Sequence, residues 1–201
     1  INLSFGGFTP TGADARVDGD VLLENRTILA FDVNDFNTGS VGLEWLLPVG
    51  EFFEVGAGVG YTSRTVPTVY NNFVNRNGAE IEQDLRLRIT PMTATVRVLP
   101  FGRSRTVKPY LGAGVGFFNY RYSEVGDFVD FTDRSVFTDR FVASGTETGP
   151  VALAGIRFPL GDTWSLGGEV RYQKAEADLS EDFLGPKLDL GGFHYLMTVH
   201  I

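Results

Sequence analysis

The chain has 201 residues, a net charge of −8 and no cysteine, which fits one domain and excludes a disulfide framework or a cysteine-based zinc site. Its 25 glycines argue against long helices, and its 17 phenylalanines argue against disorder. The acidic balance and the lack of a long basic run exclude nucleic acid as a partner. No apolar run reaches about 18 residues, so we expect no transmembrane helix. Because the chain begins at Ile1, we expect that a targeting segment has been removed.

Alternation of apolar and polar residues with a period of two predicts β-strands along the whole chain. In chain order, the predicted strands cover residues 1–9, 38–47, 52–64, 84–99, 108–122, 148–158, 163–176 and 188–201. Long polar loops are predicted at 10–37, 65–83, 123–147 and 177–187. The other three connections, around Pro48, Pro100 and Pro159, share an apolar–Pro–apolar–Gly pattern. Pro cannot donate to a β-ladder and Gly permits tight turns, so each is predicted to be a hairpin bend.

Eight strands joined alternately by short turns and long loops predict an all-β, antiparallel, up-and-down barrel over residues 1–201 as a single domain. A soluble barrel would point its apolar face inward, and a membrane barrel would point it at lipid. The strands are long enough to cross a bilayer, which needs about 9–11 tilted residues. The face opposite the apolar one carries glycine and both signs of charge, which suits a narrow, filled lumen. These features favour a transmembrane barrel.

Two groups of residues follow from this assignment. Charged residues predicted to pair inside the lumen are Glu44, Glu54, Arg97, Arg157, Glu169 and Arg171. Aromatic residues predicted to form a girdle at the membrane boundaries are Trp45, Tyr61, Phe117, Trp164, Tyr172, Phe193 and Tyr195.

The strand 84–99 changes the parity of its apolar residues at Thr90–Pro91. A β-bulge at this point would restore a common apolar face. On that interpretation Arg86, Arg88, Thr93, Thr95 and Arg97 all point into the lumen.

The stretch "LPFG…KPYLGAGVGFF", the three short turns and the alternating C-terminal strand resemble the OmpA/OmpX/OmpW-type eight-stranded outer-membrane barrels. The resemblance covers essentially the whole chain, although the last strand ends in Ile201 where these proteins usually have Phe. It implies an integral protein of the Gram-negative outer membrane, in contact with lipid and lipopolysaccharide. It also implies three short periplasmic turns, four long extracellular loops and periplasmic termini.

Catalysis is not expected, and no catalytic, metal-binding or cofactor-binding residue is assigned. The chain has only His194 and His200, and His194 is predicted to be a lumen residue satisfied by a carboxylate. Two acidic clusters offer the oxygen ligands that calcium prefers, but neither has the bidentate Glu of a full loop motif. They are Asp32, Asn34 and Asp35, and Asp127, Asp130 and Asp133.

The expected function is that of a non-enzymatic structural and interaction scaffold with a lumen plugged by charged pairs, which includes a role as a subunit of a larger envelope assembly. The alternative is a narrow pore or an OmpW-like transporter of small or hydrophobic solutes. Protein partners are expected at the loops or at the barrel wall. Phenylalanines predicted to make the loops adhesive are Phe36, Phe73, Phe128, Phe131, Phe137 and Phe141.

Overall fold

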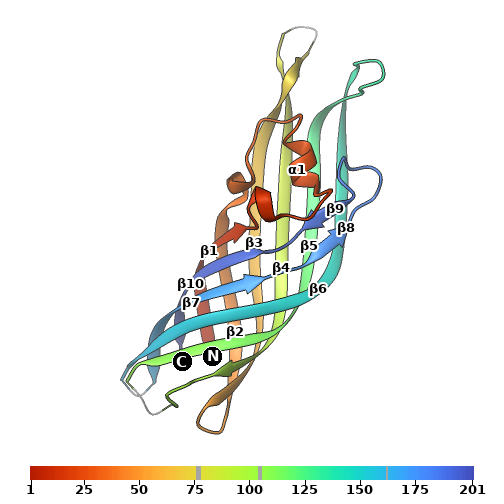
Figure 1. The fold of residues 1–201 in the computed structure, drawn as a ribbon. Coiled ribbons are helices and arrows are strands. Elements are labelled where there is room, and N and C mark those ends of the chain that lie inside the picture. Colours follow the sequence, from red (N-terminus) through yellow and green to blue (C-terminus); the bar gives the residue numbers. More distant parts are fainter. Residues whose placement is uncertain (76–77, 104–105, 162) are drawn as a thin grey trace.

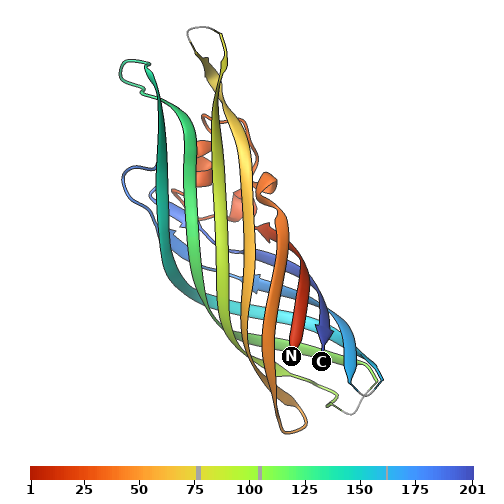
Figure 2. The same cartoon turned by 180° about the vertical axis from the view of Figure 1, so that it is seen from behind.

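A computed structural model of the chain describes residues 1–75, 78–103, 106–161 and 163–201. Its main feature is a closed antiparallel ring of eight strands in the order β1-β10-β7-β6-β5-β4-β3-β2 (Figures 1 and 2). Within the described ranges, no helix is long and apolar enough to cross a membrane. The ring confirms the predicted antiparallel barrel of eight strands.

The strands of the ring are β1 (Asn2–Pro10), β2 (Thr38–Val49), β3 (Phe53–Val74), β4 (Glu80–Val98), β5 (Lys108–Val129), β6 (Val136–Leu160), β7 (Trp164–Gln173) and β10 (Gly192–His200). Pairing of β1 with β10 closes the ring. The connection between β7 and β10 contains a small hairpin, β8 (Glu176–Asp178) and β9 (Lys187–Asp189). The connection between β1 and β2 contains the 3-10 helix η1 (Ala13–Ala15), the short α-helix α1 (Val21–Asn25) and the 3-10 helix η2 (Val33–Phe36).

The three short connections lie at one end of the barrel, which we call the turn end, and both termini lie close to it (Figure 2). Gly50, Gly102 and Gly161 have φ values of 68°, 72° and 80° in these connections. Such positive values are strained for residues with a Cβ, so glycine is required there. The expectation of three glycine-dependent hairpin bends is therefore confirmed.

The opposite end, the loop end, differs from the prediction because four strands continue far beyond the ring (Figure 1). Pairing of β2 with β3 stops at Thr62, and pairing of β6 with β7 stops at Val151. Beyond these residues β3, β4, β5 and β6 form an open four-stranded sheet. The predicted loops 65–83 and 123–147 are therefore wrong over most of their length, since they are largely strand.

The concave face of this open sheet is covered by residues 11–37 and 174–191, which we call the cap (Figure 1). The cap and the sheet share an apolar core that includes Leu22 and Leu29 from the cap and Leu85 and Tyr122 from the sheet. The segment 10–37 was predicted as a plain loop, but its apolar residues form short helices because they pack into this core. The barrel thus has an apolar interior at the loop end and a polar interior at the turn end.

The same core explains the parity change on β4. The pairing of β4 with β5 runs without a shift from Gln83 to Val98, so the predicted bulge at Thr90–Pro91 is wrong. Leu85, Leu87 and Ile89 point inward because the interior is apolar at their level. Arg86 and Arg88 consequently lie on the outer face, not in the lumen as predicted.

The loop phenylalanines were also only partly predicted. Phe36 and Phe128 are buried, and Phe73 and Phe141 pack against the core, so these four do not form an adhesive surface. Phe131 and Phe137 are exposed.

Candidate functional site

Exposed apolar side chains encircle the turn-end half of the barrel. Each strand of the ring contributes at least one, namely Phe5, Val41, Val59, Met92, Val115, Ile156, Leu166 and Met197. Exposed patches on soluble monomers rarely exceed a few hundred Å². A belt of this kind is instead the outer wall that membrane barrels present to lipid.

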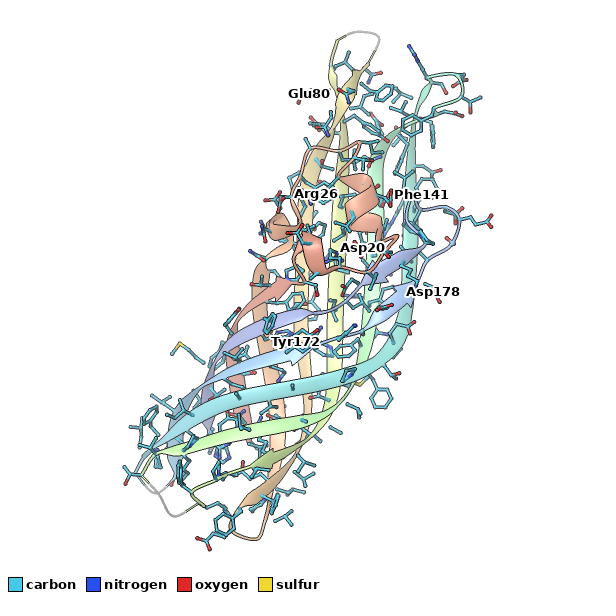
Figure 3. All side chains as sticks on the ribbon, viewed as in Figure 1. Asp20, Arg26, Glu80, Phe141, Tyr172 and Asp178 are labelled. Carbon is cyan, nitrogen blue, oxygen red and sulfur yellow. The ribbon has the colours of Figure 1, made fainter. Side chains whose placement is uncertain are left out.

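All seven predicted girdle residues lie exposed on this outer wall. Trp45 and Trp164 are close to the short turns, whereas Tyr172 and Phe193 lie at the other edge of the belt with ring centroids 4.9 Å apart. Tyr172 lies about midway along the molecule, with Glu80 close to the loop end (Figure 3). The belt therefore covers only one half of the barrel's length.

Inside the belt, four of the six predicted lumen residues form one network. Glu44 comes from β2, Arg97 from β4, and Glu169 and Arg171 from β7. Arg97 contacts Glu44 through its Nη2, and the same nitrogen lies 3.0 Å from Oε2 of Glu169. Arg171 Nη2 lies 2.7 Å from Glu169 Oε1 and 3.5 Å from Glu44 Oε2. Each carboxylate thus faces two guanidinium groups.

The remaining two lumen residues pair with each other. Arg157 donates from Nη1 and Nη2 to the two carboxylate oxygens of Glu54, at 3.1 and 3.2 Å. Tyr110 joins the two groups of charges, because the guanidinium carbons of Arg97 and Arg157 lie 4.8 and 5.4 Å from its ring centroid. Its hydroxyl donates to Glu169 at 3.0 Å. Three negative and three positive charges therefore balance inside the lumen.

Glycines on the inner face make room for these long side chains. A Cβ at Gly56 would lie 2.6 Å from both Glu44 Oε1 and Thr95 Oγ1. A Cβ at Gly112 would lie 3.1 Å from Arg97 Cγ. The alternation of glycine with charged residues along the strands is thus a packing requirement of a narrow lumen.

His194 lies in the lumen, but its partners are not the carboxylate that was predicted. Its Nδ1 lies 2.9 Å from Ser40 Oγ, and its Nε2 lies 3.0 Å from Oε1 of Gln173. The imidazole ring of His194 packs on the ring of Phe8 at a centroid distance of 4.7 Å. An amide satisfies the histidine here because Gln173 is the residue that β7 directs inward at this level.

The lumen is filled from the charged network to the cap. The cavity beside Ser40 and His194 has a volume of ≈ 20 Å³, enough for one water molecule but not for a substrate. Thr93 lines this cavity, and its buried hydroxyl has no partner in the described part of the chain. Toward the loop end, buried apolar residues such as Phe118 and Leu190 follow.

The cap contains a buried polar centre that sequence reasoning missed. Arg16 donates from Nε and Nη2 to the two carboxylate oxygens of Asp20, both at 2.8 Å, and neither side chain is exposed. Asp20 also accepts the N–H of Leu22 at the start of α1 and the N–H of Asp189 in β9. Arg16 and Asp20 stand four residues apart, but the chain between them is not helical, so no sequence pattern indicated the pair. Figure 3 shows Asp20 beside α1.

A second polar contact joins α1 to the sheet. Glu124 Oε1 accepts from Asn25 Nδ2 at 2.6 Å and from the hydroxyl of Tyr122 at 2.8 Å. These groups lie beyond the apolar belt. Burial raises the pKa of the Glu124 carboxyl above its ordinary value, and the two hydrogen bonds only partly oppose this effect.

The two acidic clusters serve local structure. Asp32 caps η2 by accepting from the N–H of Asn34, and Asp35 accepts from the N–H of Asp32. Asp130 and Asp133 accept backbone N–H groups within the turn between β5 and β6. Over the described residues, no group of three or more acidic, His or Cys side chains is arranged to hold a metal ion.

These features define a class. A closed eight-stranded antiparallel ring with a charged interior and an apolar outer belt is the fold of the OmpA/OmpX/OmpW-type outer-membrane β-barrels, as the resemblance predicted. No protein-family model matches the chain, and no curated protein matches it.

Solved structures do match it. The outer membrane protein OprG from Pseudomonas aeruginosa superposes with a TM-score of 0.51 and 13% identity, over 99% of this chain and 94% of OprG. Ail, the attachment invasion locus protein of Yersinia pestis, was solved in complex with the heparin analogue sucrose octasulfate. It matches with a TM-score of 0.47 and 12% identity, over 99% of this chain and 96% of Ail. At 13% identity the likeness to OprG establishes the fold alone.

Proposed function

We propose that this chain is an integral protein of the bacterial outer membrane that acts as a non-enzymatic interaction scaffold. The apolar belt would lie in the bilayer in contact with lipid and lipopolysaccharide. The turn end and both termini would face the periplasm, and the open sheet with its cap would stand outside the cell. Every strand of the ring contributes to the belt, which supports insertion in the bilayer. The strands β3 to β6 extend far beyond the ring at the loop end, which supports this orientation.

A plugged lumen fits the geometry better than a narrow pore or a transporter of small or hydrophobic solutes. The path through the barrel meets the balanced charge network, then Ser40 and His194, and then the apolar core beneath the cap. Buried charges that pair this closely hold each other in place, because an unpaired one would carry a large desolvation penalty. The Ser40–His194 pair has an amide neighbour and no space for a substrate, so it supports a structural role.

The open edge of β6 is the observation that carries the scaffold role. Its residues 136–149 pair with β5 on one side, and among the described residues no strand pairs with their other side; at Pro150, where the β7 ladder ends, the carbonyl accepts the N–H of Lys174. The opposite edge, on β3, is covered, since residues 28–30 hydrogen-bond to Val69 and Asn71. An uncovered edge on a rigid sheet can accept a strand from another protein. Exposed Phe137 and Val142 lie along this edge.

Site-directed photocrosslinking in intact cells tests this proposal. A photoreactive amino acid at Val142 is expected to capture a defined partner protein, whereas the same group at Thr65, exposed on β3, is expected to capture none. Particles extracted in mild detergent should then contain that partner in fixed ratio. Equal capture from both positions, or a lone 22.0 kDa chain in the particles, would contradict the scaffold role.

Single-channel conductance distinguishes a plugged lumen from a gated pore. In planar bilayers the purified protein is expected to give no steady single-channel current. A reproducible current that disappears when Arg97 or Glu169 is replaced would instead identify a gated pore.

A further inference from the structure

Four arginines from three strands meet on the outer face of the barrel. Arg86 and Arg88 come from β4, Arg121 from β5 and Arg140 from β6. Together with Ser123 they line one depression with a volume of ≈ 270 Å³. Arg86 and Arg88 are two residues apart, but Arg121 and Arg140 are distant from them in the sequence, so no basic run indicates the cluster. We call it the arginine depression.

The guanidinium groups in this depression lack anionic partners. Within the described ranges, none of the four forms an ion pair or a side-chain hydrogen bond, and Nε of Arg88 is buried without an acceptor. Arg88 lies directly opposite Arg121 in the β4–β5 pairing. Like charges opposite each other destabilise a sheet unless an anion lies between them. In a chain of net charge −8, such a cluster points to an anionic ligand.

The height of the depression indicates where that ligand comes from. On the outer face of β4 the last belt residue is Met92, which lies opposite Phe117 of β5. Thr90 and then Arg88 follow it, so Arg88 is about 13 Å further along the strand, or about 10 Å higher at the usual strand tilt. Arginine side chains near a membrane boundary reach back toward it. Arg88 and Arg121 therefore stand at the level of lipid headgroups, and Arg86 and Arg140 extend the depression further from the belt.

We propose that the arginine depression binds the phosphate groups of an outer-leaflet glycolipid, the phosphorylated lipid A part of lipopolysaccharide, while its acyl chains lie along the wall below, over Met92 and Phe117. Guanidinium forks match phosphate oxygens geometrically, and several on one site suit a ligand with two phosphates. The Ser123 hydroxyl at the base of the depression offers one further donor. The inference rests on the proposed insertion in the membrane and adds a specific lipid site to it.

Native mass spectrometry of the folded protein in detergent micelles tests this proposal. The probes are lipid A with two phosphates, the same lipid after enzymatic dephosphorylation, and inorganic phosphate. The wild-type chain is expected to retain bisphosphorylated lipid A, and the double variant R88Q/R121Q is expected to bind it at least about tenfold more weakly. A control variant, R103Q/K174Q, removes two exposed positive charges elsewhere and should bind like the wild type. Folding of each variant is verified by heat-dependent gel mobility.

Each result supports or overturns the site. Equal retention of dephosphorylated lipid A, or equal loss of binding in the control variant, would overturn it. Inorganic phosphate binding as tightly as lipid A would show a site for free anions and overturn the lipid assignment. Failure of the protein to insert into vesicles would contradict the proposed function, and the micelle measurement would still report separately on the depression.

Discussion

Arg16 and Asp20 form a two-point ion pair that is completely shielded from solvent at the centre of the cap. Through this pair η1, α1 and β9 are fixed to one another, because Arg16 also donates to the carbonyl of Asp189 and Asp20 accepts the N–H of the same residue. The pair therefore holds together two cap segments that are separated by most of the chain.

Removal of one partner should release the cap. Replacement of Asp20 by Ala leaves the Arg16 guanidinium buried without a carboxylate, and we expect a loss of about 3–5 kcal/mol in the stability of the docked cap. Amide hydrogen exchange of residues 21–25, followed by mass spectrometry, measures this loss. The barrel strands in the belt should keep their protection.

Two further variants test the cause. Arg26→Gln removes a cation whose ion pair with Asp32 is substantially exposed, and it should change exchange by less than about 1 kcal/mol. The double variant R16M/D20L replaces the pair with apolar groups and should recover much of the protection lost in D20A. Protection in D20A equal to the wild type would show that the apolar core alone holds the cap.

The ring could be predicted from the sequence because its signals are local. The alternation with a period of two and the Pro–Gly pattern of each short connection both depend on residues that are neighbours in the sequence. Gly50, Gly102 and Gly161 adopt the positive φ values that these bends need. The lumen charges could be predicted as a set because they share the inner face of their strands. Their pairing, such as Glu54 with Arg157, depends on the barrel's stagger and is not visible in a pattern.

The loop end could not be predicted in the same way, because its interior reverses polarity. Leu85 and Arg97 lie on the same inner face of β4, one in an apolar core and one among charges. A parity rule that assumes one kind of interior must insert a bulge between them. The arginine depression was missed for the related reason that Arg86 and Arg88 were placed inside.

The isolated lumen pair Glu54–Arg157 offers a test of charge pairing. Replacement of Glu54 by Gln leaves Arg157 buried with a neutral partner, and we expect the protein to lose about 3–5 kcal/mol of stability. Urea unfolding in micelles, followed by the fluorescence of Trp45 and Trp164, measures the change. The exchange variant E54R/R157E should be more stable than E54Q, and equal stability of the two would argue against a direct pair.

A glycine of the lumen face, Gly56, can be compared with one of the outer wall, Gly168. Gly56→Ala places a methyl group 2.6 Å from Glu44 Oε1, and we expect a loss of about 1–3 kcal/mol from overpacking. Gly168→Ala is the matched control on the outer wall, where the nearest atom to the new Cβ is 3.9 Å away. It should be nearly neutral in the same urea unfolding assay. Similar losses in both variants would mean that backbone conformation, and not lumen packing, sets the effect.

The cap should dock more weakly on the open sheet as the pH rises, because the carboxyl of Glu124 ionises. Its pKa is raised by burial when the cap is docked and is ordinary, near 4.5, when α1 is detached and the carboxyl is solvated. The detached state therefore loses its proton first, so docking is strongest below pH 4.5 and weakens as the pH rises through the raised pKa of the docked state. Above the raised pKa of Glu124 in the docked state, the docking free energy no longer changes with the ionisation of this carboxyl.

Glu124→Gln keeps an oxygen that can accept from Asn25 and Tyr122, and it cannot ionise. We expect this variant to retain the docked cap with a smaller pH dependence of exchange at residues 21–25, after correction for the intrinsic exchange rate at each pH. Some dependence should persist, because burial also raises the pKa of Asp189 in β9. An unchanged pH profile in the variant would assign the dependence to Asp189 and its neighbours and not to Glu124.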